Sequence, residues 1–139
     1  MEIIFFNPSK SQSGKTLLEI LNIHKNSVDT ITVIDNLDAF TKRLVTIKEK
    51  NTIAVIFAAK EFDLIELYSY KHHLYRVIPI LILPNNGREI IALGLRFNPF
   101  FIISNYNDLK KISRIISVIS MGNNINEGTD SPREYKDAA

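Results

Sequence analysis

Five short apolar runs, separated by segments with the period of an amphipathic helix, constrain the fold of this chain most strongly. The runs are rich in Ile, Val and Phe, and they cover Ile3–Phe6, Ile31–Ile34, Ile53–Ala58, Val77–Leu83 and Phe100–Ile103. The third and fourth runs are apolar almost throughout, which is typical of strands buried on both faces of a sheet. Strands of this kind occur in parallel sheets that helices cover on both sides.

The segments between the runs carry the apolar stripes of helices. Three stripes recur at spacings of three and four residues: Leu17, Leu21 and His24; Leu37, Phe40, Leu44 and Ile47; and Leu109, Ile112, Ile116 and Ile119. Asp35 or Asn36 before the second helix, and Asn107 before the fifth, are suited to cap a helix N-terminus. Alternating strands and helices predict an α/β fold with a flavodoxin-like (CheY-like), doubly wound, five-stranded parallel sheet of order 2-1-3-4-5 and helices on both faces.

One domain accounts for most of the 139 residues. We expect an α/β domain over residues 1–120, because the five strand and helix units end there. Residues 121–139, MGNNINEGTDSPREYKDAA, are polar and charged with few large apolar side chains. A segment of this composition buries too little surface to offset its ordering entropy. We therefore expect a flexible tail or linker over these residues.

Composition excludes several classes of protein. Seventeen basic and 15 acidic residues leave a net charge of only +2, so we expect neither a nucleic-acid nor a membrane partner. The absence of cysteine rules out disulfides, thiolate metal sites and a thiol nucleophile. The sequence starts without a basic leader, and Val77–Leu83 is too short to span a membrane. These features predict a cytoplasmic protein.

The functional site of such a sheet is expected beyond the carboxyl ends of its strands. The residues at those positions are Asn7 and Pro8, Ala58, Pro84 and Ser104. Lys60 is the one ionisable residue directly after these strand ends; Glu61 and Asp63 lie farther on, where we interpret them as favouring a helix N-terminus. Without a carboxylate at the strand ends we expect no metal, and without an aromatic pair in the loops we expect no flavin or other cofactor.

Two stretches give the sequence a family resemblance. Val77–Leu83, followed by Phe100–Asn105 and then Asn107-Asp108-Leu109, resembles the second half of a response-regulator receiver domain (CheY-like). By this resemblance, the acidic pair of receivers falls on Asn7 and Pro8, and the phosphoaccepting aspartate on Ala58 or Ala59. The Ser/Thr position falls on Pro84, the lysine on Ser104 and the aromatic switch position on Phe101. The chain therefore resembles a degenerate receiver, a pseudo-receiver without the phosphoacceptor.

The resemblance implies a non-catalytic module for signal transduction in the manner of two-component systems. Such a module is not an enzyme and acts by protein–protein interaction, either with a partner or with itself as a homodimer. Receivers commonly use the surface of their fourth helix, fifth strand and fifth helix for this purpose. The residues that this implies here are Arg88, Glu89, Arg96, Phe101, Tyr106, Lys110, Lys111 and Arg114.

A second hypothesis comes from the loop Ser9–Thr16, which follows the first strand. Its last three residues, Gly14, Lys15 and Thr16, match the end of the P-loop pattern G-x-x-x-x-G-K-[ST]. Ser9 replaces the first glycine, and a P-loop needs glycine there because its backbone N–H groups must close around phosphate. A divergent P-loop nucleotide-binding domain therefore stays open as the alternative.

Overall fold

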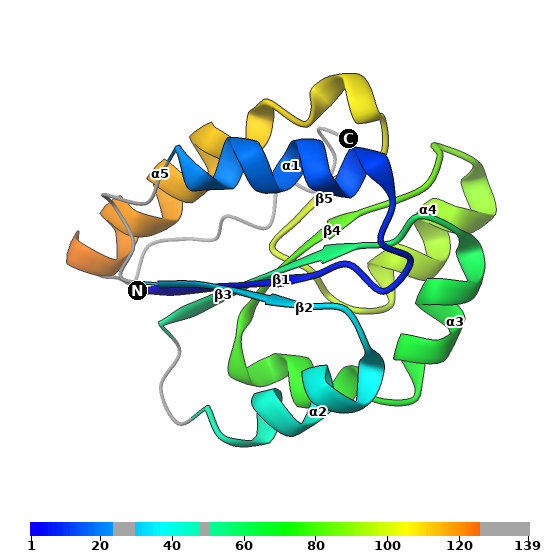
Figure 1. Ribbon diagram of the computed structural model, residues 1–139, viewed down its shortest axis with the longest axis horizontal. Helices are drawn as coiled ribbons and strands as arrows, with labels where there is room; N and C mark the ends of the chain where they lie inside the picture. Colours follow the sequence, from blue (N-terminus) through cyan, green and yellow to red (C-terminus); the bar gives the residue numbers. More distant parts are fainter. Residues whose placement is uncertain (24–29, 48–50, 126–139) are drawn as a thin grey trace.

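The computed structural model describes residues 1–23, 30–47 and 51–125 and contains a five-stranded parallel sheet (Figure 1). The strands are β1 (Glu2–Phe6), β2 (Thr30–Ile34), β3 (Thr52–Phe57), β4 (Ile78–Ile82) and β5 (Phe101–Ile103). Their order is β2-β1-β3-β4-β5, and all pairs are parallel. The fold expected from the sequence is confirmed, and the sheet order is consistent with a CheY-like fold.

Helices alternate with the strands and cover both faces of the sheet (Figure 1). The α-helices are α1 (Gln12–Asn22), α2 (Leu37–Val45), α3 (Glu61–Tyr68), α4 (Arg88–Leu95) and α5 (Lys111–Ile125). Two 3-10 helices, η1 (Lys71–Arg76) and η2 (Tyr106–Asp108), precede β4 and α5. Helices α1 and α5 pack on one face, and α2, α3 and α4 pack on the other. Within the described ranges no helix is long and apolar enough to cross a membrane.

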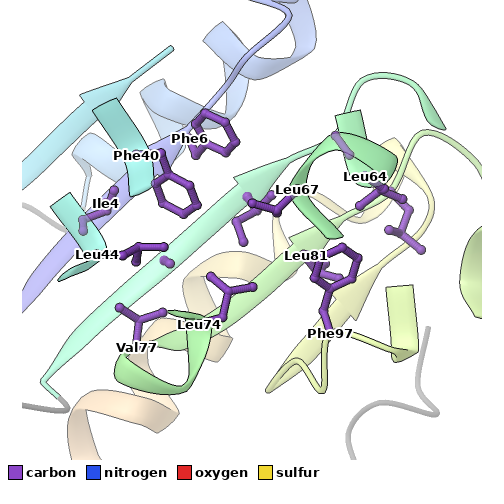
Figure 2. Packing of buried hydrophobic residues seen from close by; sticks show 14 of the residues in the cluster. Ile4, Phe6, Phe40, Leu44, Leu64, Leu67, Leu74, Val77, Leu81 and Phe97 are labelled. Carbon is purple, nitrogen blue, oxygen red and sulfur yellow. The ribbon is translucent and has the colours of Figure 1, made fainter. Parts of the chain in front are cut away.

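The strands feed two hydrophobic cores because successive side chains point to opposite faces. In β1, Ile3 and Phe5 face α1 and α5, whereas Ile4 and Phe6 face the three helices on the other side. Phe6 stacks on Phe40 of α2, with ring centroids 4.3 Å apart (Figure 2). Burial on both faces explains why the central strands read as continuous apolar runs.

The parallel register aligns the carboxyl ends of the strands. The ladder continues one residue beyond β1, β3 and β4: the N–H groups of Asn7, Ala58 and Leu83 donate to the carbonyls of Ile34, Ile82 and Ile103 at 2.8–2.9 Å. Asn7, Ala58 and Leu83 therefore lie at one edge of the sheet, which we call the carboxyl edge.

The helix ends differ in part from those expected. Asn36, one of two expected caps, accepts the Ala39 N–H at 2.8 Å and begins α2. The expectation that Asn107 caps the fifth helix is wrong, because Asn107 lies in η2 and α5 begins only at Lys111. The Asn105 side chain caps η2 instead, by accepting the Asn107 N–H at 2.9 Å.

The expected tail overlaps the last helix. Helix α5 continues to Ile125, so its final residues fall within the segment 121–139 that the sequence predicts as a tail. Residues 126–139 lie outside the described residues, as does His24 of the first apolar stripe.

Candidate functional site

The strand ends bring together most of the residues expected in the degenerate phosphorylation pocket. Asn7, Ala58 and Ser104 directly follow β1, β3 and β5, and all three are buried. Pro8 and Pro84 are partly exposed. The register aligns Leu83 with Ala58, so Pro84 lies one residue farther along the loop after β4. The site is thus a small, mostly uncharged surface at the carboxyl edge.

Asp63 is the buried carboxylate of this edge, and the sequence interpretation understated it. The residue is 8% exposed, and its Oδ2 accepts hydrogen bonds from Ser9 Oγ at 2.9 Å and from the Ala59 and Lys60 N–H groups at 3.0 and 3.3 Å. The two backbone bonds close the start of α3, as expected of an acidic residue in a first turn. The bond to Ser9 also joins the loop after β3 to the loop after β1.

Tyr106 covers the same edge from η2. Its ring lies 5.3 Å from that of Phe57, between centroids, and it is partly buried. Burial raises the pKa of Tyr106, and the negative charge of Asp63 raises it further. The phenol therefore stays protonated over the physiological range and offers this edge a neutral hydroxyl, not a nucleophilic phenolate.

Asn7 fills the space between the end of β1 and the start of α1. A Cβ atom on Gly14 would lie 2.4 Å from Asn7 Nδ2, so only glycine allows this approach. Asn7 is 7% exposed, and its Oδ1 has no hydrogen-bond partner among the described residues. The Asn7 side chain therefore fills the space that a side chain at position 14 would need.

The loop after β1 already uses one of the N–H groups that a P-loop would offer to phosphate. Helix α1 begins at Gln12, so Gly14, Lys15 and Thr16 lie in its first turns. The Gly14 N–H donates to Ser11 Oγ at 3.0 Å, and Thr16 Oγ1 donates to the Gln12 carbonyl at 3.4 Å. An N–H group that a P-loop would direct at phosphate thus donates to the capping side chain of Ser11 instead.

The implied interaction surface is only partly exposed. Its exposed members are Arg88, Glu89, Arg96, Lys110, Lys111 and Arg114, and Tyr106 is half-buried. Phe101 is 7% exposed and packs in the core under α5, so its assignment to a surface is corrected. Leu95 of α4 and Val118 of α5 are exposed apolar residues that the sequence analysis did not single out.

The described residues contain no group of three or more His, Cys, Asp or Glu side chains placed to hold a metal ion. Comparison of the chain with models of protein families, with curated proteins and with solved structures finds no match.

We expect Asp63→Ala to lower the free energy of unfolding by about 1–3 kcal/mol, because it removes the acceptor of three partly buried hydrogen bonds. Asp63→Asn keeps an acceptor oxygen and should lose less. Urea denaturation measures both. Asp38→Ala is the matched control, because Asp38 is exposed and pairs with Lys42 on the surface of α2, at a cost below about 1 kcal/mol. Equal losses in Asp63→Ala and Asp38→Ala would contradict this role.

Thermal melts with millimolar ATP and Mg²⁺ test the P-loop hypothesis. With ATP at one hundred times its dissociation constant, a working site would raise the free energy of unfolding by about 2.7 kcal/mol, which is several degrees in melting temperature. We expect no such shift, because the Gly14 N–H already donates a hydrogen bond to Ser11 and the Asn7 side chain lies against Gly14. An upward shift that disappears in Lys15→Ala would establish nucleotide binding and overturn this expectation.

Proposed function

We propose that the protein is a non-catalytic, receiver-like signalling or scaffolding module that binds a protein partner or a second copy of itself. The observation that carries the proposal is the state of the carboxyl edge. Ala58 stands at the end of β3, and the buried carboxylate of this edge, Asp63, is held by three donors. The sheet order, consistent with a CheY-like fold, supports the comparison with receivers.

Phosphoryl transfer to this edge lacks the groups that it requires. A carboxylate nucleophile must be free to approach phosphorus, and Mg²⁺ is usually held by one or two carboxylates. Asp63 Oδ2 is engaged by Ser9 and the backbone, and Ser104 follows β5 where a lysine would balance phosphoryl charge. The edge therefore favours a structural role over chemistry.

Binding through the α4–β5–α5 surface has support in the side chains it exposes. Arg88 on α4 and Arg114 on α5 are exposed cations, and Leu95 and Val118 add exposed apolar area to the same two helices. β5, at the end of the strand order, lies between these elements (Figure 1). Arginine and apolar side chains are characteristic of protein interfaces, and this charge favours an acidic partner surface.

Incubation with acetyl phosphate and Mg²⁺ should leave the protein unlabelled, because β3 ends in Ala58 and not in an aspartate. Intact-mass spectrometry measures the adduct, and an established receiver domain serves as the positive control. A stoichiometric, hydroxylamine-sensitive phosphoryl group on Asp63 or Asp35 would contradict the proposal.

Charge reversal at Lys111 and Arg114 should weaken self-association or partner binding at least about tenfold, while the melting temperature changes little because both side chains are exposed. Analytical ultracentrifugation measures self-association, and quantitative pull-down measures partner binding. Lys15→Glu with Lys42→Glu is the matched control, since these exposed lysines lie on α1 and α2. A monomer whose partner binding ignores the first double change would count against this surface.

A further inference from the structure

A pocket of about 350 Å³ lies at the opposite edge of the sheet from the candidate site. It is bounded by η1, by the first residues of β4 and by the turn after α4. Val77 and Pro79 mark the amino end of β4, and Asn98 precedes β5. Its volume falls in the range of small-molecule sites, about 300–1,000 Å³.

One wall of the pocket is apolar and rigid. Leu74, Val77 and Phe97 are each at most 5% exposed, and they belong to the core between the sheet and α2–α4 (Figure 2). Side chains in such a core are held by close packing. The wall is therefore formed before any ligand arrives.

The rim of the pocket is basic. Lys71, His72 and Arg96 line it, and no acidic side chain does. Within the part of the chain that the structure describes, neither Lys71 nor Arg96 forms an ion pair. Both cations therefore face the rim without a carboxylate to neutralise them.

One of the two cations, Lys71, contacts the phenol of Tyr68, whose ring packs edge-on against Phe97 of the apolar wall. Lys71 Nζ donates to the Tyr68 hydroxyl oxygen at 3.1 Å and lies 4.5 Å from the centre of its ring. Lys71 lowers the pKa of Tyr68, and Arg96 lowers it further against the opposing effect of burial. The local field thus favours negative charge at this point.

The carbonyl groups at the end of α4 do not by themselves account for Arg96. Lys71 and Arg96 follow α3 and α4, whose C-termini attract positive charge. However, the last carbonyls of α4, those of Leu93, Gly94 and Leu95, already accept backbone N–H groups at 3.0–3.1 Å. The side chain of Arg96 is therefore not needed to satisfy them.

An aromatic side chain completes the rim. Tyr75 lines the pocket, although it is 63% exposed, and the Arg76 guanidinium lies 5.3 Å from the centre of its ring. The stretch 68–76, YSYKHHLYR, contains aromatic, histidine and basic residues and no acidic one. Exposed aromatic rings beside cations suit ligands with a planar ring and an anionic group.

We propose that this pocket binds a small organic phosphate with a planar ring, of the class of a nucleoside monophosphate. The phosphate lies between Lys71 and Arg96, and the ring lies on Tyr75 and the apolar wall. This site is independent of the α4–β5–α5 interaction proposal, except that Arg96 belongs to both.

The direct test is to titrate the full chain with AMP, adenosine and inorganic phosphate and to measure binding by isothermal calorimetry. Tyrosine fluorescence is a second readout, because the chain has no tryptophan. We expect AMP to bind with a dissociation constant below about 1 mM and each half to bind at least about tenfold more weakly. Failure of AMP to bind at several millimolar, or equal binding of AMP and inorganic phosphate, would overturn the proposal.

Variants locate the site. Lys71→Ala with Arg96→Ala should weaken AMP binding at least about tenfold, because each cation supplies a charge-assisted hydrogen bond to phosphate. Tyr75→Ala should reduce AMP binding toward that of inorganic phosphate. Lys110→Ala with Arg114→Ala, exposed cations at α5, is the matched control and should bind AMP normally. Unchanged binding in the first pair, or an equal loss in the control, would overturn the site; Lys71→Gln with Arg96→Gln repeats the test should the alanine pair fail to fold.

Discussion

The hydrogen-bonded ladder that joins β1, β3 and β4 in parallel register determines at which edge of the sheet the described loops lie. Glu2–Phe6 pairs with both β2 and β3, and β3 passes the same alignment on to β4. Because the strands are parallel, the described loops that follow strands lie at one edge, and the described segments that lead into β4 and β5 lie at the other. The candidate site and the basic pocket are consequences of this separation, since each gathers residues that are distant in the sequence.

Hydrogen bonds and packing between loops fix the arrangement of the carboxyl edge. Asp63 links the loops after β1 and β3 through Ser9, and Asn7 packs against Gly14 at the start of α1. Tyr106 adds a protonated hydroxyl above Phe57. A carboxylate used in this way stabilises the loop arrangement, and it is correspondingly less available to a metal ion or a phosphoryl group. In many parallel sheets this edge binds a ligand. In this protein its polar groups instead hold the loops after β1 and β3 together.

The sequence predicted the sheet because burial on both faces leaves a continuous apolar run, as in Ile53–Phe57. It predicted less where a contact joins distant residues. The Ser9–Asp63 bond spans 54 positions, so no local spacing indicates it. The resemblance to receivers implied a surface role for Phe101, but a resemblance carries no information on burial in this chain, and all three residues of β5 are buried. The sequence does not indicate the pocket, because η1 and the turn after α4 come together only in the folded chain.

Arg96 links the two proposed sites physically. It ends α4 on the implied interaction surface, and it also lines the basic pocket beside Tyr68. A phosphate that engages Arg96 neutralises a charge which an acidic partner would otherwise meet. Thermodynamic linkage then requires reciprocity. If the bound anion weakens partner binding by a given factor, the bound partner weakens anion binding by the same factor. Lys111 and Arg114 on α5 do not line the pocket, so reversing their charge tests the partner surface separately from the pocket.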